Sequence, residues 1–85
     1  MNSMYGRATI TFDDGSVFPA EIDIRFITHD NAMSGSGTIV SDDIMAMAYK
    51  GGTPIVGCAG HKFRVVITEA TSDGRGTIKT SGSPL

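Results

Sequence analysis

Hydrophobic and polar residues alternate along most of the chain, and short glycine-containing turns interrupt the alternation. The clearest run covers residues 17–26, where one side carries Phe18, Ala20, Ile22, Ile24 and Phe26 and the other carries Pro19, Glu21, Asp23 and Arg25. A period of two is typical of a strand that buries one face, and a shift of one residue would place three charges in the core. The pattern therefore predicts a strand with a well-defined register.

A second alternating run precedes this strand and predicts a hairpin. Residues 5–12 place Ala8, Ile10 and Phe12 on one side, and residues 13–16 provide the Asp and Gly chemistry of a tight reversal. Pro19 has no backbone N–H, so we expect its side of the second strand to be an edge or a bulge.

The remaining segments complete a mainly β pattern. We interpret residues 28–35 as a polar loop and residues 37–40 as a short third strand, while residues 62–70 and 76–80 predict a C-terminal hairpin. The glycine-rich segment 53–60 is harder to place, although Ile55 and Val56 could pair briefly at an edge.

A short helix is predicted between the third strand and the C-terminal hairpin. Ser41 is a favoured N-cap residue, and Asp42 and Asp43 would then lie in the first turn. The helix should run through residues 44–50 and end at Gly51. These elements predict a small antiparallel β-barrel or strongly curled sheet of five to six strands with one short α-helix.

The length of 85 residues indicates a single domain spanning residues 1–85. A core of this size usually gives only marginal stability, which oligomerisation would increase. Cys58 is the single cysteine, so no disulfide can form within the chain. We therefore expect a homo-oligomer, with a dimer as the simplest assembly.

The net charge and the first residues restrict the expected partners and the expected cellular location. The formal net charge is −2, so the chain lacks the excess of basic residues that binds a nucleic-acid backbone. Four basic residues near the C-terminal hairpin nevertheless suggest a modest anion-binding face: Lys62, Arg64, Arg75 and Lys79. The first residues lack the basic and apolar segments of a signal peptide, and no apolar run could span a membrane. We expect a cytoplasmic protein that binds neither nucleic acid nor membrane.

Cys58 and His61 are the pair with the greatest chemical potential. A thiol and an imidazole three residues apart in a glycine-rich segment could form a nucleophile and its base, with backbone N–H groups nearby for an oxyanion. A lone cysteine is more often a small buried hydrophobe, and no acid lies close by in the sequence to orient the histidine. We therefore expect no catalytic residues.

The sequence also gives little support for a metal site or a cofactor site. Cys58 and His61 are two ligands where structural zinc requires four, and completing the set would need His29 and Asp30 from a distant loop. The acidic pairs Asp13-Asp14 and Asp42-Asp43 could serve a hard cation, but turn formation and helix capping already explain them. We expect neither a metal nor a cofactor.

The methionine-rich helix is the strongest candidate for an interaction surface. Met45 and Tyr49 form an i, i+4 pair beside the face that carries Ile44 and Met47, and methionine provides the adaptable apolar surface used at binding sites. Core packing is the alternative explanation for Met45, Met47 and Tyr49, because a small barrel needs its helix to close one end. Ile27, on the outer side of the second strand, is a further apolar candidate.

Three functional hypotheses follow from these residues. The first is a non-enzymatic module that associates with itself or with another protein through the helix. The second is a small-ligand barrel with a pocket under the helix near Met45, Tyr49 and Phe26, which would require roughly 300 Å³ or more. The third, an enzyme built on Cys58 and His61, has the least support.

Overall fold

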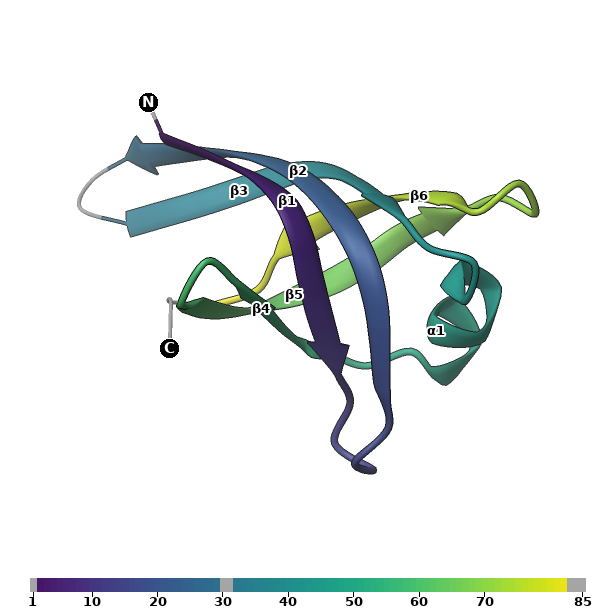
Figure 1. Ribbon diagram of the computed structural model, residues 1–85. Helices are drawn as coiled ribbons and strands as arrows, with labels where there is room; N and C mark the ends of the chain where they lie inside the picture. The colour runs from purple at the N-terminus through teal and green to yellow at the C-terminus, as the bar shows by residue number, and fades with distance from the viewer. Residues whose placement is uncertain (1, 30–31, 83–85) are drawn as a thin grey trace.

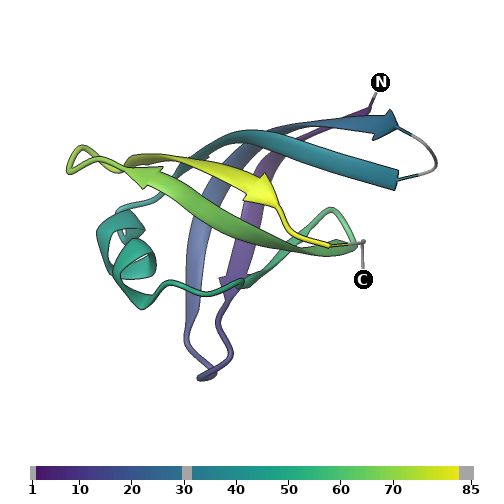
Figure 2. The ribbon, with the colours of Figure 1, turned by 180° about the vertical axis from the view of Figure 1, so that it is seen from behind.

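A computed structural model describes residues 2–29 and 32–82 and shows a closed antiparallel barrel, which confirms the predicted mainly β fold (Figure 1). The strands run in the order β1-β2-β3-β6-β5-β4 around the barrel. Their bounds are β1 (Asn2–Thr11), β2 (Val17–His29), β3 (Ala32–Val40), β4 (Ile55–Cys58), β5 (His61–Ala70) and β6 (Arg75–Thr80). One helix, α1 (Ile44–Lys50), lies between β3 and β4 and packs at one end of the barrel against β5 (Figures 1 and 2).

The alternation seen in the sequence orients β2 as expected. Ile22 and Ile24 are 2% and 0% exposed, whereas the intervening Asp23 is exposed. Two edge-to-face aromatic pairs lie within the barrel: Phe12 on Phe18, with ring centroids 5.7 Å apart, and Phe26 on Phe63, with centroids 5.6 Å apart. The second pair joins β2 to β5, so strands that are not neighbours in the sheet are connected through the core.

The prediction of a loop over residues 28–35 was wrong. β2 continues to His29 and β3 begins at Ala32, and the two strands pair from Glu21↔Val40 to His29↔Ala32. A small residue permits this pairing at Gly35, which lies opposite Phe26, because an added Cβ there would lie 2.8 Å from the Phe26 ring. The composition that suggested a loop therefore serves close strand contact.

Pro19 occupies the position that its missing N–H requires. The pairing of β2 with β3 starts at Glu21, so β3 does not extend to Pro19. The carbonyl of Pro19 instead accepts a hydrogen bond of 2.8 Å from the hydroxyl of Ser41. This confirms that Pro19 lies on a locally unpaired edge of β2.

The helix covers the predicted residues, but Ser41 is not its N-cap. The hydroxyl of Ser41 accepts from the N–H of Asp43 at 3.1 Å, and the carbonyl of Ser41 accepts from the N–H of Ile44 at 3.2 Å. These bonds form a turn before the helix, and Asp43 takes the N-cap position without a side-chain hydrogen bond. The acidic pair therefore lies outside the first turn. Within residues 2–29 and 32–82, no helix is long and apolar enough to cross a membrane.

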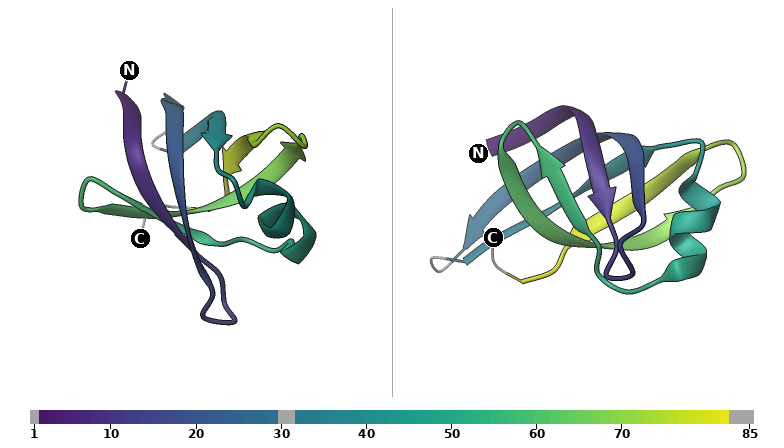
Figure 3. Two further views of the ribbon diagram at one scale, coloured as in Figure 1. Left: turned by 45° about the vertical axis from the view of Figure 1, so that its right-hand side comes forward. Right: turned by 60° about the horizontal axis from the view of Figure 1, so that its bottom comes forward.

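The glycine-rich segment closes the barrel. Residues 55–57 pair with Thr9–Thr11 of β1, while β4 also pairs with β5 from Ile55↔Arg64 to Cys58↔His61. The expectation of a brief edge strand was wrong, since β4 has a neighbour on each side. Closure nevertheless rests on only three residue pairs between β1 and β4. Beyond them, the N-terminal half of β1 and the β4–β5 hairpin diverge (Figure 3).

Candidate interaction surfaces

The helix separates a buried face from an exposed apolar flank. Ile44 and Met47 are 1% and 0% exposed and close the end of the barrel, whereas Met45 and Tyr49 are 53% and 95% exposed. Residues four apart lie on the same side of a helix, so the methionine and the tyrosine form one surface. We call Met45 and Tyr49 the helix face. Met47, which was predicted as a further interface residue, belongs to the core.

The space next to the helix is too small for the proposed ligand pocket. A cavity of about 70 Å³ lies between Ala48 on the helix and Val66 and Ile67 on β5. Phe26, which was expected to line the pocket, packs instead against Phe63. Ligand pockets usually enclose about 300 Å³ or more, so this cavity does not support the ligand-binding hypothesis.

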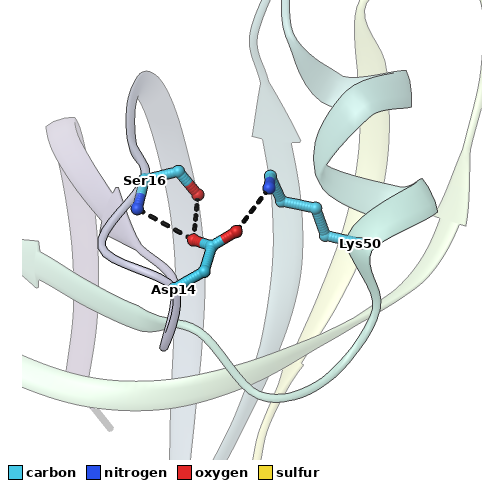
Figure 4. A network of polar contacts seen from close by, with 3 residues as sticks. All are labelled: Asp14, Ser16 and Lys50. Atoms are coloured by element: carbon cyan, nitrogen blue, oxygen red, sulfur yellow. Dashed lines mark hydrogen bonds and ion pairs between the residues drawn. The ribbon is translucent and has the colours of Figure 1, made fainter.

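An ion pair connects the first hairpin with the helix. The ammonium of Lys50 lies 2.7 Å from a carboxylate oxygen of Asp14, and the other oxygen of Asp14 accepts from the N–H and hydroxyl of Ser16 (Figure 4). Hydrogen bonds from Lys50 and then from Ser16 hold the pKa of Asp14 well below its ordinary value of 3.8. Asp14 thus has a structural role between the β1–β2 turn and the end of α1.

Because of this ion pair, we expect the stability of the protein to depend on pH in a specific way. Because folding depresses the pKa of Asp14, its contribution is present above the ordinary carboxyl pKa and is lost as the pH falls through the folded-state pKa. Asp14→Asn should lower the melting temperature at neutral pH, and the difference from wild type should shrink towards about pH 2. Thermal melts across this range measure it. Asp23→Asn, which alters an exposed carboxylate on the outer side of β2, should leave the acid dependence of the wild type in place; a parallel loss at all pH values in Asp14→Asn would contradict the assignment.

Cys58 and His61 are paired neighbours in the structure, but they differ in solvent exposure. The two residues face each other across the β4–β5 turn, whose central residues Ala59 and Gly60 have φ values of 51° and 82°. Cys58 is only 5% exposed and packs in the core, while His61 is exposed. A nucleophile must reach its substrate, so this burial favours a packing role for the thiol.

Neither acidic pair forms a cation site among the described residues. Asp14 is engaged by Lys50 and Ser16, and Asp13 lies 3.6 Å from the guanidinium of Arg64. Among the described side chains, no group of three or more His, Cys, Asp or Glu residues has metal-binding geometry. The side chain of His29 and the whole of Asp30, which were considered as further ligands, lie outside the described part.

A shallow cleft of about 530 Å³ runs over the β1–β4 pairing to the β4–β5 turn and reaches Arg7, the first residue of β1 beyond that pairing to line it. Its lining includes the basic residues Arg7, His61 and Lys62 and the hydroxyl residues Thr9 and Thr11, with no carboxylate among the described lining residues. We call this cleft the seam. Sequence reasoning missed it, because Arg7 and Lys62 are far apart in the chain and only barrel closure brings them together.

The anion-binding face predicted on the C-terminal hairpin stays a prediction. Only Lys62 of that basic group lines the seam. Arg64 donates to the carbonyl of Thr53 at 2.8 Å, while Arg75 pairs with Val40 and Lys79 with Ser36 on the outer surface. Arg64 therefore already has a polar partner within the chain.

Ile27 is exposed but remote from the helix face. Its exposed fraction is 63%, and it pairs with Ser34 near the end of β2. This end of β2 and α1 lie at opposite ends of the molecule in both ribbon views (Figures 1 and 2). Ile27 and the helix face are therefore separate apolar positions.

Comparison with known proteins identifies no relative: no family model, curated protein or solved structure matches the chain. Function must therefore be argued from the surfaces of this barrel.

Proposed function

We propose that this protein is a non-enzymatic interaction module that associates with a second copy of itself through the helix face. The observation that carries the proposal is the contrast within α1, where Met47 is fully buried and Tyr49 is 95% exposed. The barrel end is already closed by Ile44 and Met47, so packing within one chain does not explain the exposed pair. Exposed aromatic and methionine side chains are enriched at protein interfaces.

The charges around the helix suit a symmetric dimer. Asp42 and Asp43 precede the helix, and Lys50 ends it. In a two-fold arrangement with antiparallel helices, the acidic end of each helix lies near Lys50 of its mate. The ammonium of Lys50 has three donors, of which Asp14 uses one, so a second carboxylate can be accommodated. In such a dimer, pairs of opposite charges would lie on either side of the apolar contact between the two helix faces.

The double variant Met45→Glu/Tyr49→Glu tests this function. Each large apolar side chain that becomes fully buried contributes about 1.5–3 kcal/mol, so the dimer Kd should rise by at least about a hundredfold. Size-exclusion chromatography with light scattering at micromolar concentration should show a dimer for the wild type and a monomer for the variant. Circular dichroism should show that the monomer remains β-rich.

A matched control separates the helix face from general surface change. Tyr5 and Val17 are 82% and 55% exposed on β1 and β2, and Tyr5→Glu/Val17→Glu adds the same charge there. This control should remain dimeric. A monomeric wild type, or equal dissociation of both double variants, would overturn the proposed role of the helix face.

A further inference from the structure

One edge of β1 lacks a partner over most of its length. β1 pairs with β2 from Thr11↔Val17 to Asn2↔Phe26 without a shift in register, but it pairs with β4 only from Thr9 to Thr11. No described strand lies on the β4 side of residues 2–8. The ribbon views from front and back both show this end of β1 pointing away from the β4–β5 hairpin (Figures 1 and 2).

The hydrogen-bond alternation identifies the groups that are free at this edge. The N–H of Phe12 donates to the carbonyl of Ser16 at 2.9 Å, so this pair is hydrogen-bonded at the start of the hairpin. Antiparallel pairs alternate between bonded and non-bonded types, so odd-numbered residues of β1 direct their N–H and C=O away from β2. Pro19, which has no N–H, lies opposite Thr9 and agrees with this assignment. Ser3, Tyr5 and Arg7 therefore present their backbone groups at the free edge.

The seam beside this edge has a positive charge that the protein as a whole lacks. Lys62 and Arg7 line it without a described carboxylate, although the net charge of the chain is −2. Arg7 also borders a second hollow that contains Glu21, Asp42 and Asp43, which reduces its contribution. Lys62 is therefore the principal cation for a ligand in the seam.

We propose that the free edge of β1 accepts an extended acidic segment of a partner protein, which adds as a strand along the seam. The backbone of the segment would bond to Ser3, Tyr5 and Arg7, and the carboxylates on the outer face of the segment would approach Lys62. Strand addition requires an extended peptide, and the charge requires an acidic one. A second copy fits this edge poorly, because symmetric pairing would bring two cationic seams together. This site is distinct from the helix face and does not depend on self-association.

Binding is tested with short fluorescein-labelled peptides by fluorescence anisotropy. A peptide of alternating Glu and Val should bind, one of alternating Lys and Val should not, and added salt should weaken binding. Lys62→Glu replaces an attraction by a repulsion and should raise the Kd about five- to tenfold. Lys79→Glu makes the same charge change on the outer face of β6 and should have little effect.

Amide hydrogen exchange measured by NMR tests the strand geometry in the wild-type protein. The Glu-Val peptide should newly protect the amides of Ser3, Tyr5 and Arg7, while those of Met4 and Ala8 are already protected by β2. Binding without this alternate protection would overturn strand addition. Equal binding of the Lys-Val peptide, or tighter binding of an oligothymidylate, would overturn an acidic peptide as the ligand.

Discussion

Ile39→Ala is expected to lower the free energy of unfolding by about 2–5 kcal/mol, the usual cost of removing a large aliphatic side chain from a core. Ile39 is 0% exposed and lies between Ile22 of β2 and Gly76 of β6. Domains of this size often have only about 3–5 kcal/mol in total. The variant should therefore be largely unfolded near physiological temperature, as measured by urea denaturation.

Ile27→Ala provides the matched control for this loss. Ile27 is also a strand isoleucine, but it is 63% exposed. Its replacement should cost less than about 1 kcal/mol, the range of strand propensity. Equal destabilisation by the two substitutions would show that burial of Ile39 does not explain its contribution.

Gly37→Ala should destabilise the barrel by about 1–3 kcal/mol or more, because it overpacks a close backbone contact. The added Cβ would lie 1.9 Å from the carbonyl oxygen of Asp23 and 2.8 Å from the Cα of Ile24. Both neighbours are backbone atoms of β2, so relief requires the strands to separate. Chemical denaturation measures the loss, and amide exchange should increase along the β2–β3 pairing.

Gly57→Ala tests whether the effect is specific to close contact. Gly57 is also a strand glycine, but its nearest neighbour to an added Cβ is the carbonyl oxygen of Thr9 at 3.9 Å. This substitution should change stability by no more than about 0.5 kcal/mol. If Gly57→Ala were as damaging as Gly37→Ala, the cost would arise from strand glycines in general.

The first hairpin, the helix and the C-terminal hairpin could be predicted because their signals are local. The alternation over residues 17–26 specified which side of β2 is buried, since any slip would bury Glu21, Asp23 and Arg25. The helix followed from an apolar segment ended by Gly51, whose φ is 68°. The exposed helix pair could be anticipated from the same spacing, because Met45 and Tyr49 lie four residues apart.

The sequence by itself therefore determined the order of the elements and the buried side of each alternating strand. Only the tertiary structure decided that residues 32–35 form a strand, because they carry no alternation of their own and their conformation depends on pairing with β2. The tertiary structure also decided where the seam forms, that Cys58 is buried, and that Ser41 forms a turn before the helix. Each depends on contacts between distant segments, such as Thr9 with Gly57 and Ser41 with Pro19, and a local pattern of residue types carries no information about such pairings.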